Sequence, residues 1–225
     1  MYLSRLFLNP RSRDVRRDLS DCQDMHRTVL RCFPTASGPA RQEHEILYRL
    51  ETTVARPQLL VQSRTAPDWK ALPHGYLAEA PLDVNPATTS LERLFGSVRE
   101  QARYRFRLVA NPTRDICVPQ PDGSKVEKRV ELRGEEAWYQ WLERKGMQHG
   151  FRPLRHAAKP EVLNAAATAP GKLRGRRQGA TITVAPVRFD GLLVVTDSER
   201  FRETLASGIG RSRAYGCGLL SVAPV

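Results

Sequence analysis

The spacing of apolar and polar positions divides the start of the chain into a short strand and an amphipathic helix. Residues 3–8 are mostly apolar and are followed by Asn9-Pro10, which predicts a strand that stops there. Ser20 and Gln23 match the Ser-x-x-Gln capping box, which predicts a helix that starts at Ser20 and is closed by Pro34. Helical spacing predicts its buried side, formed by Cys22, Met25, Val29 and Phe33, and places Gln23, Arg27 and Arg31 on its polar side.

The rest of the first half contains further strands and an irregular segment. The run 11–18 carries four arginines and two aspartates, and we expect it to form a solvated face. Residues 46–50 and 59–62 have the pattern of strands. Between residues 66 and 90 four prolines predict an irregular segment that ends in a connection between domains.

The opening pattern returns in the middle of the chain. Residues 104–115 again place an apolar strand before Asn-Pro, with Asn111 lying 102 positions after Asn9. A shared Asn-Pro also arises by chance, but the distance is that of a whole domain, so the pattern favours an internal repeat.

The second half carries the same kinds of element. A helix is predicted at 135–145 and another from Ser198, its N-cap, to Gly208, followed by a strand at 219–222. An Asp190-Gly191 turn is predicted to join 181–189 to 192–195 as a hairpin. The order of elements fits an α+β fold of two tandem ferredoxin-like domains (βαββαβ, also used by RNA-recognition domains), at residues 1–95 and 96–225.

Charge then narrows the class of partner. The 225 residues carry 36 lysines and arginines against 24 acids, a net charge of +12, which favours a polyanion. The region from Arg144 to Phe189 holds ten basic residues and one acid, Glu161.

The four cysteines are scattered and include no C-x-x-C pair, so they signal neither a zinc site nor a disulfide framework. The first residues make a poor signal peptide and no apolar run is long enough for a membrane helix, so we expect a cytoplasmic protein.

The segment 208–218 pairs Gly208-x-Gly210 with Gly216-x-Gly218 around Arg211 and Arg213. Glycines allow positive φ and close approach of the backbone to phosphate, and arginines supply the matching charge. The spacing fits neither a dinucleotide-binding fingerprint nor a Walker loop. An ordinary glycine-rich turn is the alternative to a nucleic-acid contact.

His26 is the histidine best placed for chemistry, because it precedes Arg27 on the capped helix. Metal-free RNA cleavage needs a base for the 2′-hydroxyl, an acid for the leaving oxygen and cations for the phosphate, and histidine suits the first two roles. A histidine packed at a helix edge is the alternative. We expect no metal or other cofactor, since D-x-D and H-E-x-x-H patterns are absent from the sequence. The absence of G-x-S-x-G argues against a serine nucleophile.

Four segments in this order resemble the CRISPR repeat-processing endoribonucleases of the CasE type. They are the strand before Asn9-Pro10, residues 24–28 (Asp-Met-His-Arg-Thr), residues 67–69 (Pro-Asp-Trp) and the closing Gly-x-Gly-x5-Gly-x-Gly-Leu-Leu-Ser-Val-Ala-Pro. The resemblance implies a metal-independent endoribonuclease of two ferredoxin-like domains. It would bind the stem-loop of CRISPR repeat RNA and cut at the 3′ base of the stem, leaving a 2′,3′-cyclic phosphate and a 5′-hydroxyl. The resemblance further implies a protein that stays on its product with other Cascade subunits and is a monomer outside that complex.

The resemblance also assigns residues. His26 and Arg27 take the catalytic positions, and Arg31 lines the same helix. A basic hairpin in the stem's major groove corresponds to Lys172, Arg174, Arg176 and Arg177. With the glycine-rich loop these give the expected RNA-binding residues: Arg31, Lys172, Arg174, Arg176, Arg177, Gly208, Gly210, Arg211, Arg213, Gly216 and Gly218.

Gln23 departs from the family, since relatives can carry a tyrosine there. It keeps a second interpretation open, a non-catalytic RNA-hairpin-binding subunit. Net charge alone also allows a DNA-binding architectural protein.

Overall fold

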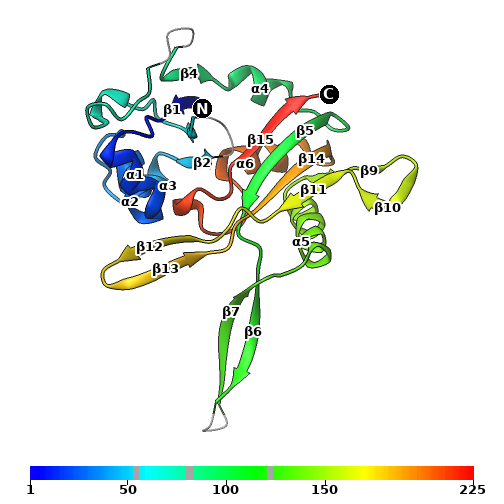
Figure 1. Cartoon of the computed structure of the whole chain (residues 1–225). Helices are drawn as coiled ribbons and strands as arrows, with labels where there is room; N and C mark the ends of the chain where they lie inside the picture. Colours follow the sequence, from blue (N-terminus) through cyan, green and yellow to red (C-terminus); the bar gives the residue numbers. More distant parts are fainter. Residues whose placement is uncertain (53–55, 80–83, 121–123) are drawn as a thin grey trace.

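The computed structural model describes residues 1–52, 56–79, 84–120 and 124–225. It shows two α+β units side by side, with hairpins that project from the second unit (Figure 1). None of the described helices is long and apolar enough to cross a membrane.

The N-terminal unit is a four-stranded antiparallel sheet with helices on one face. Its sheet order is β2-β3-β1-β4, with β1 between β3 and β4. Its core includes Leu6, Val15, Met25, Val29 and Val61, each at most 3% exposed. The second helix of a ferredoxin-like unit is reduced to one turn, η1, where nearby prolines remove backbone donors. Its elements are β1 (Tyr2–Phe7), α1 (Arg13–Ser20), α2 (Cys22–Leu30), α3 (Ala40–Glu43), β2 (Leu47–Glu51), β3 (Gln58–Ser63), η1 (Trp69–Ala71) and β4 (Ala87–Ser90).

The C-terminal unit repeats this topology. Its sheet order is β11-β14-β5-β15, with β8 also paired to β14, so β5 occupies the position that β1 holds in the first sheet. On β5, Tyr104, Phe106 and Leu108 point into the core while Arg103 and Arg105 are exposed. The elements are β5 (Arg103–Ala110), α5 (Glu135–Gln148), β8 (Phe151–Pro153), β11 (Ala165–Thr168), β14 (Val187–Val195), α6 (Ser198–Ser207), η2 (Arg213–Tyr215) and β15 (Leu220–Pro224).

Both sheets therefore have the strand order of a ferredoxin-like fold, which confirms the predicted fold class and internal repeat. The connecting helix α4 (Glu92–Ser97) contains the expected boundary at residue 95, and that boundary stays a prediction.

Three two-stranded hairpins are inserted into the second unit (Figure 1). The β6–β7 hairpin extends farthest from the sheets, and the β12–β13 hairpin passes beneath the N-terminal helices. The strands are β6 (Thr113–Pro119) with β7 (Lys125–Glu131), β9 (Arg155–His156) with β10 (Lys159–Leu163), and β12 (Leu173–Arg177) with β13 (Ala180–Val184).

The predicted Asp190-Gly191 turn is wrong. These residues lie inside the continuous strand β14, and the chain turns instead at Gln178 and Gly179, whose φ values are 49° and 80°. Gly191 is needed within β14 for another reason. A Cβ at Gly191 would lie 2.5 Å from the carbonyl oxygen of Asn164 on the neighbouring segment.

Helix starts and one charged run also differ from the predictions. The Asp21 carboxylate caps α2 by accepting from the backbone N–H groups of Gln23 and Asp24, while Ser20 ends α1. Asp197, not Ser198, caps α6. The charged run at residues 11–18, expected to be a solvated face, forms most of α1. One side of this helix faces the core, since Val15 is buried and the buried Asp18 accepts a hydrogen bond from Tyr76.

Candidate active site and nucleic-acid interface

Three elements meet between the two domains: α2, the β12–β13 hairpin and the glycine-rich loop that contains η2. The second carboxylate oxygen of the α2 cap, Asp21 Oδ2, accepts from the backbone N–H of Arg176 at 3.2 Å. A Cβ at Gly175 would lie 2.7 Å from Asp21 Oδ1 and 2.9 Å from Cys22 Sγ. Glycine at 175 therefore lets the hairpin lie directly against the first turn of α2.

The glycine-rich loop packs against the N-terminal sheet from the other side. Gly208 and Gly216 are buried, have φ values of 77° and 80°, and approach Leu47 and Tyr48 of β2. Gly218, at φ 94°, is buried against the carbonyl oxygen of Ile209. The structure thus gives these three glycines a packing role, and their contact with RNA stays a prediction, as does that of the half-buried Gly210.

His26 projects from α2 toward this loop and is half-buried. Its ring lies 6.2 Å from the Tyr215 ring, centroid to centroid, at an angle of 70°. Neither ring nitrogen forms a hydrogen bond to any of the described residues. The other histidines next to buried structure are engaged, since His44 contacts Thr65 and the Pro34 carbonyl and His149 contacts Thr204.

Burial lowers the pKa of His26 to about 4, and the charges of Arg41, Arg177 and Arg27 act in the same direction. The imidazole is therefore neutral near pH 7 and has a lone pair that can accept a proton. Spacing in the sequence identified His26 but gave no sign of this shift, which depends on residues from three separate elements.

Arg41 is a site residue that sequence reasoning missed. It lies on the short helix α3, and burial lowers the pKa of its guanidinium. Its positive charge lowers the pKa of both His26 and Arg213, so Arg41 lies close enough to act electrostatically on both groups. Arg41 stands outside any motif, and only the path of the chain between α2 and β2 brings it to the site.

The expected basic residues of α2 are both exposed. The Arg27 Nη1 donates to Asp24 Oδ1 at 2.8 Å, an ion pair that fixes the guanidinium along the helix. Arg31, one turn later, has no ion pair with any described residue.

Gln23 lies on the buried side of α2, 8% exposed, so its assignment to the polar face is wrong. Its Oε1 accepts a hydrogen bond from the Tyr215 hydroxyl at 3.3 Å. A tyrosine hydroxyl therefore does reach this part of the site, from the glycine-rich loop and not from α2.

The arginines of β12 divide between the two faces of the hairpin. Alternate side chains of a strand point to opposite faces, and Gly175 marks the face toward α2. Arg177 shares that face and lowers the pKa of His26, whereas Arg174 and Arg176 alternate to the other face, and all three side chains are exposed. Lys172 at the base of the hairpin pairs with Glu131 of β7 at 2.9 Å.

The loop arginines continue the basic surface. Arg211 is exposed, and Arg213 is half-buried with its Nε donating to the Gly210 carbonyl at 3.0 Å. Among the described residues no cluster of three or more histidine, cysteine or acidic side chains could hold a metal ion. The site thus offers one neutral imidazole, one tyrosine hydroxyl and several cations.

Comparison with known proteins places this arrangement in a family. A family model described as CRISPR associated protein matches residues 1–224. The chain belongs to the CRISPR associated protein family. Within it, the chain is 37% identical over 230 residues to the CRISPR-associated endoribonuclease Cse3 of Thermus thermophilus, with both chains covered completely. It is 27% identical over 232 residues to the CRISPR system Cascade subunit CasE of Escherichia coli K12, again over the whole of both chains.

Solved structures of CRISPR associated proteins have the same fold. Thermus thermophilus Cse3 bound to an RNA representing a pre-cleavage complex gives a TM-score of 0.76 at 36% identity, over 99% of this chain and 98% of that one. Cas6e from Escherichia coli gives 0.71 at 22% identity over both whole chains, which supports the fold alone.

Proposed function

We propose that this chain is a metal-independent endoribonuclease that binds the stem-loop of CRISPR repeat RNA and cuts at the 3′ base of the stem. The observation that carries the proposal is His26, a neutral imidazole held among cations where α2, the β12–β13 hairpin and the glycine-rich loop meet. Similarity over the full length to a CRISPR-associated endoribonuclease supports it.

The reaction is an internal transfer at one phosphate. The 2′-oxygen attacks the adjacent phosphorus, His26 accepts its proton, and the bond to the 5′-oxygen breaks. The leaving oxygen takes up a proton from water, so the products carry a 2′,3′-cyclic phosphate and a 5′-hydroxyl. Arg27, Arg177 and Arg213 supply positive charge for the phosphate as negative charge builds on its oxygens.

Binding uses the basic surfaces on either side of this centre. Arg174 and Arg176 face away from α2 and are available to the major groove of an RNA stem, with Lys172 at the hairpin base. Arg31 and Arg211 extend the positive surface along the helix and the loop. A cytoplasmic subunit that keeps its product and assembles with other Cascade subunits fits the relation to CasE.

Cleavage of a repeat RNA from the source organism in excess EDTA tests this function. We expect the wild-type protein to cut once, and His26→Ala to slow single-turnover cleavage by about 10²–10⁴-fold, the usual contribution of a general acid or base. A substrate with a 2′-deoxy sugar at the scissile position should not be cut at all.

The alternative, a non-catalytic RNA-hairpin-binding subunit, draws on Gln23, whose amide is buried and engaged by Tyr215 where relatives can carry tyrosine. Tight binding of the hairpin by the wild-type protein without any cleavage would favour this alternative. Equal cleavage by wild type and His26→Ala would instead remove His26 from the chemistry.

A further inference from the structure

A second basic site lies outside the His26 centre, at the base of the β6–β7 hairpin. A cleft of about 480 Å³ separates this hairpin from the C-terminal half of α5 and from the glycine-rich loop. Five cations line it: Arg114, Arg129, Arg144, Lys145 and Arg211. These five residues define what we call the flank cleft.

Acidic side chains do not balance this charge. Among the described residues that line the cleft, Asp115 is the one acid, and it pairs with Arg129 at 2.6 Å. Within the described part of the chain Arg114, Arg144 and Arg211 form no ion pair, and the Lys145 ammonium donates to the amide oxygen of Gln148 at 2.9 Å. Burial lowers the pKa of Lys145, and Arg144, Arg211 and Arg213 lower it further. Cations held together in this way would be stabilised by a bound polyanion.

The flank cleft is continuous with the His26 centre through the glycine-rich loop. Gly210 and Arg211 line the cleft, and the Gly210 carbonyl accepts from Arg213 Nε. The charge of Arg41 lowers the pKa of Arg213, and it also lowers the pKa of His26. The loop is fixed to the end of β5 by the Asn111 amide, which donates to Ser212 Oγ at 2.9 Å. The same short loop therefore places Arg211 in the cleft and Arg213 on the side of the His26 centre, so a nucleic-acid strand that leaves the cutting site would pass this loop on its way into the cleft.

The lining indicates which part of the strand is bound. Trp141, the one aromatic residue of the cleft, is 3% exposed and stacks on Phe189, so its face is not available to a base. Guanidinium and ammonium groups recognise phosphate oxygens. A concave site of this volume is of the size that takes a small ligand or a single strand, not a duplex.

We propose that the flank cleft binds the sugar–phosphate backbone of single-stranded RNA that continues from the repeat hairpin. This inference rests on the proposed function and extends it, since it gives the substrate a second, sequence-independent contact beyond the stem. The strand on the 5′ side and the strand on the 3′ side of the hairpin have the same backbone chemistry, so the experiment compares both.

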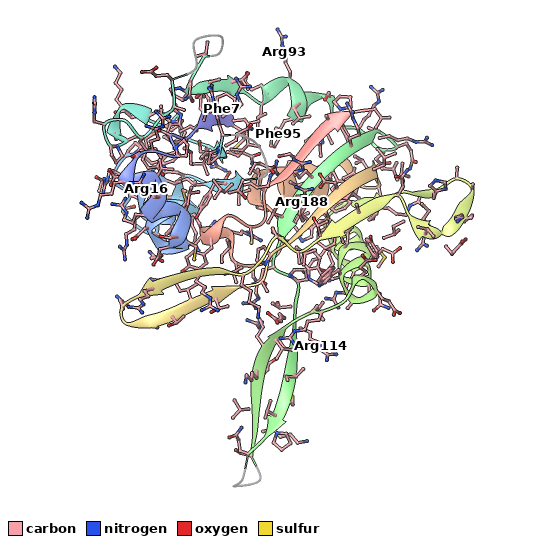
Figure 2. The ribbon with its side chains drawn as sticks, in the orientation of Figure 1. Phe7, Arg16, Arg93, Phe95, Arg114 and Arg188 are labelled. Carbon is pink, nitrogen blue, oxygen red and sulfur yellow. The ribbon has the colours of Figure 1, made fainter. Side chains whose placement is uncertain are left out.

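The test measures binding of three RNAs that carry a 2′-deoxy sugar at the scissile position: the minimal hairpin, the hairpin with a 5′ flank and the hairpin with a 3′ flank. The variant Arg114→Gln/Arg144→Gln removes two charges of the cleft. Its matched control, Arg93→Gln/Arg99→Gln, removes two exposed charges from the region of α4. Figure 2 shows Arg93 pointing away from the ribbon at the top of the view, far from Arg114, which lies beside the β6–β7 hairpin in the lower half.

We expect one flanked RNA to bind wild type more tightly, and with a steeper salt dependence, than the minimal hairpin. The cleft variant should lower that slope by about 1.4, since each phosphate contact to a single strand contributes about 0.7, and should bring the affinity ratio of flanked to minimal RNA towards one. The control should keep the wild-type slope and ratio.

If the salt dependence of binding has the same slope for the cleft variant and the control on both flanked RNAs, the proposal is overturned. An acidic segment of a partner protein would then be the next candidate to test as the occupant of the cleft. Failure of the proposed function gives different results. If the protein does not recognise the hairpin, wild type will not bind the minimal hairpin. If it binds the hairpin without cleaving it, wild type will leave the unmodified repeat RNA uncut in the EDTA assay, whatever the slopes measured here.

Discussion

His26 combines a low pKa with ring nitrogens that no described residue engages, and both properties follow from the position of α2 between a loop and a hairpin. The helix periodicity puts His26 beside the buried Met25 and Val29, which removes water from one side of the ring. Arg41 and Arg177 reach the ring from α3 and β12 and oppose a positive charge on it. The same environment that keeps the imidazole neutral is ready to stabilise an anionic phosphate.

This environment predicts the pH dependence of cleavage. Above a pH of about 4 the free protein holds His26 neutral, so kcat/KM should stay level from pH 8 to 5 and fall as the pH passes through 4. A bound phosphate favours the imidazolium, so the profile at saturating protein should have its midpoint at a higher pH than the kcat/KM profile. Single-turnover rates at low and high protein concentration measure both profiles.

Unfolding must be followed in the same experiments. The folded pKa of His26 lies below the unfolded value of about 6.5, so protonation favours the unfolded chain, and stability contributed by His26 is lost as the pH falls from about 6.5 to 4. His26→Gln should remove this part of the pH dependence. A cleavage rate that rises on acidification would contradict a neutral base and favour a protonated His26 as the acid.

Sequence reasoning succeeded at residues governed by local periodicity and failed at residues governed by long-range packing. Met25 and Val29 needed only the helical repeat, and they are buried as expected. Cys22 of the same predicted stripe is only half-buried, and Phe33 is buried beyond the end of α2, which stops at Leu30 and not at Pro34. Gln23 was assigned to the polar face because it is polar, yet a hydroxyl 192 positions later satisfies its amide in a buried position. Arg41 has no local signal at all, because only the tertiary fold brings α3 to His26.

At the scale of elements, the basic segment at residues 172–177 does belong to a hairpin, but residues 180–184 pair with it and not with 192–195 as predicted. Asp190-Gly191 has the sequence of a tight turn, and the structure uses the glycine inside β14 for a close approach to Asn164. In the β12–β13 hairpin, side chains alternate between two faces, and this separates an effect on His26 from RNA binding, two roles that the sequence did not distinguish. Arg177 lies on the face toward α2 and lowers the pKa of His26, whereas Arg174 and Arg176 alternate to the opposite face, although all three are exposed.

Two hairpin variants should therefore behave differently. Arg177→Gln removes a charge that lowers the pKa of His26, so the midpoint of the kcat/KM profile should move to higher pH. Arg174→Gln/Arg176→Gln should leave that midpoint in place and reduce the salt dependence of hairpin binding by up to about 1.8, at about 0.9 per phosphate contact of a duplex. The pH profiles of cleavage and the binding affinities at several salt concentrations separate the two effects. If the kcat/KM profiles of both variants had the same midpoint pH, the two faces of the hairpin would not differ in their effect on His26.

At the scale of the whole molecule, buried polar contacts hold the domains together and so set the geometry of the site. Tyr48 donates to the carbonyl of Ala214 at 2.7 Å, and Gln62 Nε2 donates to that of Leu205 at 2.6 Å. Arg49 on β2 is 3% exposed, and its Nη1 donates to the Leu219 carbonyl and to Ser221 Oγ. Because Leu219 directly follows the glycine-rich loop, these contacts hold the loop against the domain that carries His26.

Arg49→Ala should consequently weaken both stability and catalysis. Arg49 Nε pairs with Glu51 at 2.8 Å, and loss of the arginine leaves that buried carboxylate with Arg107 alone, at 3.3 Å. Removing one partner of a buried ion pair typically costs about 3–5 kcal/mol, so urea unfolding should show a fall in the free energy of unfolding of this size. Cleavage under conditions where the variant is folded should also slow, because the loop that carries Tyr215 and Arg213 loses the contacts that hold its C-terminal end to β2 and, of the described hydrogen bonds to that strand, keeps only the one from Tyr48 to Ala214.

Arg105→Ala on the exposed face of β5 is the matched control and should change neither quantity. If Arg49→Ala had the same free energy of unfolding and the same cleavage rate as this control, other contacts would hold the two domains in register, and the position of the loop would not depend on the buried arginine.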